Sequence, residues 1–328
     1  MERRKKTRIK RIVLIALSVA LLIVIADYYA YPWWQPIRAP IADKGQNGLW
    51  VRYKFYFGEH TDDEIDALAH RIVDGRFSDA YIHVRFIKKD GSLAYRYPER
   101  AKHLLSRLRE SAPGTRMIAW VYAGNESGGG EVDLTDRRVR KKMVDEAVWL
   151  VDVCGFDGVQ WDYETCPDGD TNLLKLLTET RTALPTGARL SVCAPVIYPL
   201  GLRFGWSQGY VSKIAQYVDQ VAVMCYDTGY LTPRSYVALT RKQVVWFTQL
   251  VSKASKHANV VIGVPTYGQG LRSHNPRAEN LRNALRGVRE GLARDDAVKD
   301  AFAGVAVFAD YTTTEDEWKT YRALWLGD

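Results

Sequence analysis

Two carboxylates lie two residues apart in the stretch Phe156–Glu164, which has the sequence FDGVQWDYE. Side chains of a β-strand alternate between its two faces, so Gln160, Asp162 and Glu164 share one face. Carboxylates about 6.6 Å apart along a strand raise each other's proton affinity. One of the two can then keep a proton at neutral pH, as an acid that protonates a leaving group must. The competing interpretation is a hydrogen-bonded polar rim without chemistry.

Two further stretches carry polar groups at the end of a predicted strand. In Ala222–Asp227, with the sequence AVMCYD, alternation places Met224 and Tyr226 on the inward face. A carboxylate, Asp227, follows at once. The third stretch is Gly263–Gly268, with the sequence GVPTYG. We expect all three stretches to meet at one edge of the sheet.

The elements that must position these groups alternate regularly along the chain. The predicted strands cover 49–57, 79–87, 115–122, 156–163, 188–195, 219–226, 259–266 and 303–309, and the predicted helices cover 61–73, 99–111, 136–153, 171–184, 207–217, 240–257, 279–302 and 315–326. The helix over 279–302 is interrupted by Gly287 and Gly291. Eight strand–helix units favour a (β/α)8 barrel over an open doubly wound sheet. Chemistry in such barrels lies where strands end and the following loops begin.

On these motifs the chain resembles the catalytic domain of glycoside hydrolase family 18, the chitinase-like barrels, over about residues 48–328. The family motifs are Asp-Gly-x-Asp-x-Asp-x-Glu on the fourth strand, Met-x-Tyr-Asp on the sixth and Gly-x-Pro-x-Tyr-Gly on the seventh. The matching residues are Asp157, Gly158, Asp162 and Glu164; Met224, Tyr226 and Asp227; and Gly263, Pro265, Tyr267 and Gly268.

The resemblance implies substrate-assisted hydrolysis of a β-linked N-acetylhexosamine glycan, such as chitin or a cell-wall polymer. It implies that Glu164 protonates the leaving oxygen, that Asp162 orients the acetamide of the substrate, and that Tyr226 donates a hydrogen bond to it. The expected substrate-binding residues are Gln160, Asp227, Met224, Trp120, Tyr122, Tyr267 and Phe308. We expect no cofactor and no metal, and we expect the chain to act as a monomer.

The sequence departs from the family pattern at three places. Gln160 stands where the family has its middle Asp; it can hydrogen-bond to Asp162 but cannot share a proton with it. Phe308 stands near the usual position of a Trp beneath the reacting sugar. Residues 123–130 replace the usual Ser-x-Gly-Gly. These departures motivate the alternative of a non-catalytic, lectin-like glycan-binding barrel with a degenerate active site.

The N-terminus predicts export. Residues 1–11 carry a net charge of +6 of the total +8, which leaves a nearly neutral body and no case for nucleic-acid binding. Residues 12–34 consist of an apolar run, Ile12 to Ala26, followed by Asp27 and a cluster of aromatic residues, as expected for a transmembrane signal-anchor with the N-terminus inside and the barrel outside. The alternative is a signal peptide that is cleaved, followed by secretion. Residues 35–47 are expected to be a linker and residues 48–328 the hydrolase-like domain.

The four cysteines and one Gly-x-Ser-x-Gly motif are the other candidates for chemistry in the sequence. Cys154 and Cys166 lie on opposite sides of a predicted strand, too far apart for a disulfide. Cys193 and Cys225 lie in apolar strands and are predicted to be core residues. No Cys-x-x-Cys or His-Glu-x-x-His spacing supports a metal site. The Gly-x-Ser-x-Gly pattern around Ser207 follows a predicted loop, so Ser207 is expected to cap a helix rather than act as a nucleophile.

Overall fold

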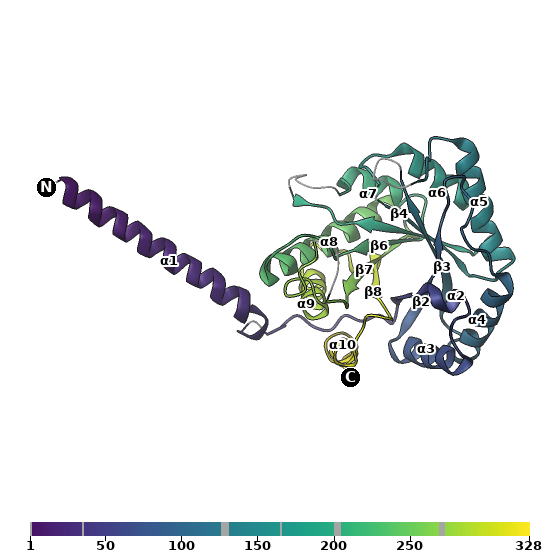
Figure 1. Cartoon of the computed structure of the whole chain (residues 1–328), viewed down its shortest axis with the longest axis horizontal. Coiled ribbons are helices and arrows are strands. Elements are labelled where there is room, and N and C mark those ends of the chain that lie inside the picture. The colour runs from purple at the N-terminus through teal and green to yellow at the C-terminus, as the bar shows by residue number, and fades with distance from the viewer. Residues whose placement is uncertain (1, 35, 126–130, 165, 200–204, 269–272) are drawn as a thin grey trace.

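A closed barrel of eight parallel strands is the centre of the computed structural model, which describes residues 2–34, 36–125, 131–164, 166–199, 205–268 and 273–328. Each strand pairs with the next one along the chain, and β8 closes the barrel against β1. Helices surround the strands on the outside (Figure 1). The (β/α)8 architecture is therefore confirmed.

The strands of the barrel are β1 Asn47–Val51, β2 Phe77–Phe86, β3 Arg116–Gly124, β4 Gly158–Glu164, β5 Arg189–Pro195, β6 Gln220–Met224, β7 Asn259–Pro265 and β8 Phe302–Phe308. The helices are α1 Glu2–Trp34, α2 Tyr53–Tyr56, α3 Asp62–Asp74, α4 Pro98–Ser111, α5 Arg137–Asp152, α6 Thr171–Ala183, α7 Gln208–Ile214, α8 Pro233–Ala254, α9 Leu281–Leu292 and α10 Glu315–Tyr321. A short 3₁₀ turn, Lys299–Ala301, precedes β8, and a π-helical turn, Arg322–Leu326, follows α10.

The first predicted strand is wrong in its second half. β1 ends at Val51, and the aromatic residues that follow form the single helical turn α2. The backbone N–H of Arg52 donates to Asp310 Oδ1 at 3.0 Å, so a side chain takes this donor at the end of the strand. The aromatic residues of α2 instead pack on other rings, with Tyr56 centred 5.9 Å from Tyr97. An aromatic run suits either structure, and tertiary packing decides it.

Two helices also differ from their predicted bounds. α8 begins at Pro233, seven residues before the predicted start at 240, because Thr232 caps it and proline suits a first helical turn. α9 ends at Leu292, ten residues before the predicted end at 302, and Gly287 and Gly291 do not interrupt it. A Cβ on Gly287 would lie 2.6 Å from Thr240 Cβ, and one on Gly291 would lie 2.7 Å from Val244 Cβ. These glycines therefore allow α9 to lie close against α8.

The smaller sequence signals agree with the structure. Thr61 forms a capping box at the start of α3, and Ser207 caps α7 by accepting from the Tyr210 N–H. The cysteines Cys154, Cys166, Cys193 and Cys225 are all free, and Cys193 and Cys225 are buried. The loop over 123–130 is described only to Asn125; residues 126–130 lie outside the described part of the chain.

Hydrogen bonds cross the interior of the barrel below the carboxyl ends of its strands. The Tyr81 hydroxyl donates to Gln220 Oε1 at 2.7 Å, and the Ser191 hydroxyl donates to the same oxygen at 3.1 Å. Gln160 Nε2 donates to Ser191 Oγ at 3.0 Å. Gln160 Oε1 accepts from Trp50 Nε1 at 2.8 Å. Buried polar groups that are paired in this way hold the strands in one arrangement.

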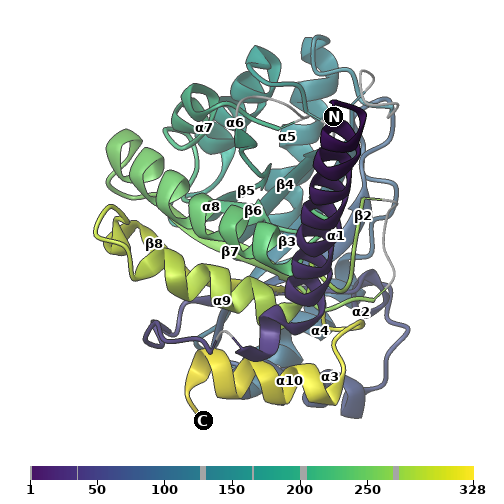
Figure 2. The same cartoon turned by 90° about the vertical axis from the view of Figure 1, so that its left-hand side faces the viewer.

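The helix α1 projects away from the barrel, and its N-terminus lies far from the strands (Figure 1). In Figure 2, seen from the side of α1, this helix lies in front of the barrel. Its segment Ile9–Tyr31 contains an 18-residue window that has a mean hydropathy of 2.6 and no buried residue, so it is long and apolar enough to cross a membrane, as a signal sequence also can be. Residues 36–46, which follow it, contain no helix or strand.

The end of α1 contacts the barrel. Tyr31 is buried between two cations, with the guanidinium groups of Arg234 on α8 and Arg286 on α9 lying 4.7 and 4.8 Å from its ring centre. Asp27 forms an ion pair with Arg234 at 2.5 Å. The side chains of Trp33 and Trp34 lie outside the described part of the structure.

Candidate active site

A cavity of about 460 Å³ lies at the carboxyl ends of the barrel strands. It is lined by Trp50, Trp120, Tyr122, Asp162, Glu164, Cys193, Met224, Tyr226, Asp227, Tyr267, Phe308, Tyr311 and Thr312. Nine of the ten residues expected from the sequence are among them. The fourth, sixth and seventh strand motifs thus meet in one place, because parallel strands bring their carboxyl ends to the same mouth of the barrel.

Asp162 and Glu164 both point into the barrel from β4. The residues between and beside them, Trp161 and Tyr163, belong to the outer core between strands and helices. The Trp161 indole N–H donates to Thr180 on α6 at 3.2 Å. This alternation fixes which face of β4 carries the acids.

The two carboxyls have different surroundings. Asp162 is 4% exposed, and its Oδ2 accepts a hydrogen bond from Trp120 Nε1 at 2.8 Å. Its Oδ1 is buried and has no hydrogen-bond partner within the described residues. Burial raises the pKa of Asp162. An acceptor atom without a donor in such a site is available to an N–H group of a ligand.

Glu164 is the stronger candidate for a proton donor. The charge of Asp162, followed by burial, raises the pKa of Glu164 to about 8. Two neighbouring carboxyl groups whose pKa values are separated by their surroundings can hold one proton between them at neutral pH. Glu164 is then the member of the pair that is protonated.

Tyr226 and Cys193 present neutral groups to the carboxyl pair. Burial raises the pKa of Tyr226 well above its usual range, so the phenol stays protonated and can donate a hydrogen bond. Burial and the charge of Asp162 likewise raise the pKa of Cys193, which keeps the thiol neutral. The site therefore has a carboxyl pair, a phenol donor and a neutral thiol.

Aromatic rings form much of the cavity wall, with Phe308 at their centre. The Phe308 ring stacks on Tyr226 at 4.8 Å between centroids. The rings of Trp50, Trp120 and Tyr267 meet it edge-on at 5.6, 5.9 and 5.9 Å. Phe308 thus belongs to an extensive apolar surface, although the residue itself is smaller than the Trp of the family pattern. Aromatic and apolar walls with few polar groups are typical of sites for small organic ligands.

Gln160 is the one expected site residue that does not line the cavity. It is fully buried beneath it, and its hydrogen bonds go to Trp50 and Ser191. The expected hydrogen bond to Asp162 is not among its contacts. Gln160 reaches the site indirectly, because it holds the Trp50 indole that forms part of the wall.

The sequence reasoning missed Trp50 and Cys193 as site residues. Trp50 lies in a run of aromatic residues in which both strand faces carry rings, so alternation could not single it out. Cys193 was predicted to be a core residue, and it is buried. Its side chain also lies beside Asp162 and lines the cavity. Tyr311 also lines the cavity, whereas Trp206 is buried and donates to the Cys166 carbonyl at 3.2 Å.

A (β/α)8 barrel with a carboxyl pair at the end of β4 and an aromatic cavity defines a glycosidase-like protein. The sequence profile described as Glycosyl hydrolases family 18 matches residues 55–325. The chain therefore belongs to this family of glycosidases, as its motifs predicted.

The individual relatives share only a small part of their sequence with this chain. A probable endochitinase of Caenorhabditis elegans is 28% identical over 167 residues, which cover 43% of this chain and 26% of that protein. The chain thus spans about a quarter of the length of this curated relative. The 28% identity applies only to the matched region.

Solved structures agree in fold. The spore cortex-lytic enzyme SleL of Bacillus cereus superposes with a TM-score of 0.58 at 13% identity, over 85% of this chain and 74% of that one. The Group IV chitinase of Ostrinia furnacalis superposes with a TM-score of 0.58 at 15% identity, over 86% of this chain and 99% of that one. A class V chitinase mutant of Cycas revoluta in complex with (GlcNAc)3 gives 0.57 at 14% identity, over 85% and 98%.

Proposed function

We propose that this chain hydrolyses a β-linked N-acetylhexosamine glycan by substrate-assisted retention. The observation that carries the proposal is the pair of β4 carboxyls, in which Glu164 holds a proton and Asp162 Oδ1 has no hydrogen-bond partner among the described residues. A glycosidase of this kind needs one acid for the leaving group and one acceptor for the acetamide N–H. It needs no enzyme nucleophile.

In the first step, Glu164 transfers its proton to the glycosidic oxygen as the bond to the anomeric carbon breaks. The acetamide carbonyl oxygen of the substrate attacks the same carbon and forms a cyclic oxazolinium ion. Asp162 accepts the acetamide N–H and stabilises the positive charge that develops there. The Tyr226 phenol donates a hydrogen bond to the acetamide and holds it in line for attack.

In the second step, the Glu164 carboxylate takes a proton from water, and the water oxygen attacks the anomeric carbon. The oxazolinium ring opens, the acetamide is restored, and the product keeps its anomeric configuration. Two inversions at the same carbon give this net retention. Glu164 ends the cycle protonated, ready for the next leaving group.

The rest of the cavity is proposed to bind the sugar chain. The aromatic wall around Phe308 would carry the apolar face of the sugar in the site, with Trp120, Tyr122 and Tyr267 beside it. Asp227 and Met224 would contact the same sugar. Among the structurally similar proteins, one is a spore cortex-lytic enzyme and another was solved with (GlcNAc)3, which supports cell-wall or chitin-like glycans as the substrate class.

The barrel is proposed to face outward on an uncleaved membrane anchor. The segment Ile9–Tyr31 is long and apolar enough to span a membrane, with basic residues before it and aromatic residues at its end, which supports an anchor. Asp27 and Tyr31, at the end of this helix, contact α8 and α9 and so attach the anchor to the barrel. Under the alternative, cleavage after Ala26 releases a secreted barrel that keeps these contacts.

The experiment that tests the reaction compares two substrates with the full-length chain in detergent. Oligomers of N-acetylglucosamine should be cleaved with retention, as proton NMR of the fresh product shows, and deacetylated glucosamine oligomers should not, because they lack the attacking acetamide. Peptidoglycan is tested beside them. Binding of these N-acetylated glycans without any turnover would refute the proposal and favour the lectin-like alternative.

A further inference from the structure

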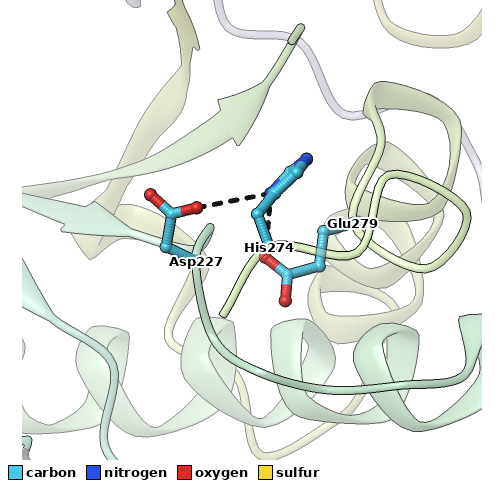
Figure 3. A group of neighbouring side chains, drawn as sticks. All are labelled: Asp227, His274 and Glu279. Atoms are coloured by element: carbon cyan, nitrogen blue, oxygen red, sulfur yellow. Dashed lines mark ion pairs between the residues drawn. The ribbon is translucent and has the colours of Figure 1, made fainter. Parts of the chain in front are cut away.

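A second group of polar side chains lies beside the cavity. Asp227 follows β6, whereas His274 and Glu279 lie between β7 and α9. One side-chain ligand atom from each of the three lies within 4.8 Å of the others. Figure 3 shows the two carboxylates on either side of the imidazole, joined to one of its nitrogens by dashed lines. The proposed hydrolysis uses neither His274 nor Glu279.

The His274 imidazole is buried, and its Nδ1 has no hydrogen-bond partner among the described residues. The His274 side chain is 1% exposed, and Nδ1 lies 3.4 Å from Asp227 Oδ1 and 3.5 Å from Glu279 Oε2. Neither Nδ1 nor Asp227 Oδ1 makes a hydrogen bond to any part of the chain that the structure describes. Buried polar atoms without partners are costly, so this arrangement calls for a bound group.

The other imidazole nitrogen indicates the tautomer. His274 Nε2 lies 3.1 Å from the Tyr267 carbonyl oxygen, which can only accept a hydrogen bond. Nε2 therefore carries a hydrogen. In a neutral ring, the lone pair of Nδ1 then faces two carboxylate oxygens, and a cation is needed between them. Metal-binding histidines commonly donate their second ring nitrogen to a backbone carbonyl in this way.

The distances fit a small cation. Tetrahedral coordination with bonds of about 2.0–2.2 Å places neighbouring ligand atoms roughly 3.3–3.6 Å apart. The two measured separations from Nδ1, 3.4 and 3.5 Å, lie in this range. A direct N–H···O hydrogen bond would have been shorter, at about 2.9 Å.

The charge of the group also favours a cation. Within the described ranges, the ion pairs of Asp227 and Glu279 are made only with His274, and none involves a lysine or arginine. A divalent ion would balance both carboxylates, whereas a single proton on the imidazole would balance one. A mixed imidazole and carboxylate set suits Zn²⁺ better than Ca²⁺ or Mg²⁺, which prefer oxygen ligands alone.

Neighbouring groups hold the three side chains in place. The Thr228 backbone N–H and hydroxyl donate to the two oxygens of Glu279 at 3.1 and 2.8 Å. The His274 ring stacks on Tyr267 with 4.4 Å between centroids. Metal sites are commonly supported by such outer contacts, which orient the ligands before the ion arrives.

We propose that Asp227, His274 and Glu279 bind one divalent transition-metal ion, with Zn²⁺ as the matching chemistry. Asp227 also lines the cavity, so the ion would fix one wall of the sugar site. It would act on substrate positioning rather than on proton transfer at Glu164. The site depends on no residue of the carboxyl pair.

The test measures metal binding to the full-length chain in detergent after treatment with a chelator. Isothermal titration with Zn²⁺ should give one ion per chain, and Co²⁺ should give the visible absorption of a four-coordinate site. His274→Ala and Glu279→Gln should each weaken Zn²⁺ binding by more than the roughly 10- to 100-fold that is typical of losing an outer contact to a metal ligand. His257→Ala, at an exposed histidine, is the matched control and should bind as the unmutated chain does.

The unmutated chain alone can overturn the proposal, so the test does not depend on the variants folding. No bound ion and no Co²⁺ spectrum, with both His274 ring nitrogens protonated at neutral pH in nitrogen NMR, would establish an imidazolium bridge instead. Equal Zn²⁺ affinity in His274→Ala would place the ion elsewhere. Because the readout is binding, the result is independent of whether the glycan is cleaved.

Discussion

Asp162 and Glu164 lie on the same face of one strand, and their neighbours make them chemically different. Asp162 accepts from Trp120 and lies beside the neutral thiol of Cys193. Glu164 is subject to the charge of Asp162 itself. The division of labour that we propose between Glu164 as the acid and Asp162 as the acetamide partner therefore rests on contacts with β3 and β5, and not on the two residue types.

The first prediction at this scale is a bell-shaped pH profile of turnover. Glu164 must be protonated, and its pKa is raised to about 8, so activity should fall as the pH rises through about 8. Asp162 must be ionised, and burial raises its pKa to about 6, so activity should fall as the pH drops through about 6. Measurement of kcat/KM from pH 4 to 10 checks both limbs. Flat activity to pH 10 would exclude Glu164 as the acid.

The second prediction concerns Gln160. A carboxylate here would match the family motif, yet Gln160→Asp should not raise turnover, because the shorter side chain cannot hold Trp50 and would bury a charge. We expect a loss of about 2–3 kcal/mol of stability and lower activity. Gln160→Asn shortens the side chain without a charge, and Gln160→Glu adds the charge at full length. Urea unfolding and kcat of the three variants separate the effect of the lost contact with Trp50 from the effect of the buried charge. Faster hydrolysis by Gln160→Asp would contradict this account.

At the scale of elements, the order and type of the eight strands could be predicted because their apolar runs are bounded by clear turns and helix caps. Local structure that depends on contacts far apart in the sequence could not be predicted. The turn α2 depends on the carboxylate of Asp310, far along the chain, which takes the N–H of Arg52. The continuous α9 depends on how closely α8 approaches it, and a single sequence gives no measure of that approach.

The candidate site divides in the same way. Asp162, Glu164, Tyr226 and Tyr267 could be found because motifs place them at strand ends. The role of Gln160 could not, because its partner Trp50 lies 110 positions earlier in the chain. The group of Asp227, His274 and Glu279 could not be predicted either, since its members come from two loops with no characteristic spacing.

The prediction at this scale is that Gly287→Ala destabilises the barrel. Alanine normally stabilises a helix relative to glycine by about 1 kcal/mol. Here the new Cβ would lie 2.6 Å from Thr240 Cβ, and the helices α8 and α9 would have to separate. We expect a net loss of about 1–3 kcal/mol in urea unfolding.

The matched control for this substitution is Gly209→Ala in α7, where a Cβ would meet no atom within 4 Å. It should leave stability unchanged or raise it. Equal effects of the two substitutions would show that the close contact between α8 and α9 is not needed.

At the scale of the whole molecule, the chain joins a catalytic barrel to an apolar helix whose end contacts α8 and α9. If this helix is an anchor, the barrel works near a membrane and meets polymeric glycans at the cell surface. The contact of Tyr31 with Arg234 and Arg286 would then limit how far the barrel can swing from the membrane.

The prediction at this scale is that the chain remains intact in the membrane. It should be recovered from the membrane fraction at its full mass of 37.3 kDa, and removal should require detergent rather than high salt. Externally added protease should reach the barrel in cells whose outer surface is accessible. Recovery of a soluble chain that begins after residue 26 would instead identify a signal peptide.

The central claim is that Glu164 is the acid of a working glycosidase, and one measurement tests it most directly. The full-length chain and Glu164→Gln are compared for hydrolysis and binding of N-acetylglucosamine oligomers. Loss of the acid should lower kcat roughly 100- to 10,000-fold while oligomer binding is retained, because Gln keeps the shape of the side chain without its proton. Hydrolysis by Glu164→Gln at the rate of the unmutated chain would contradict the claim.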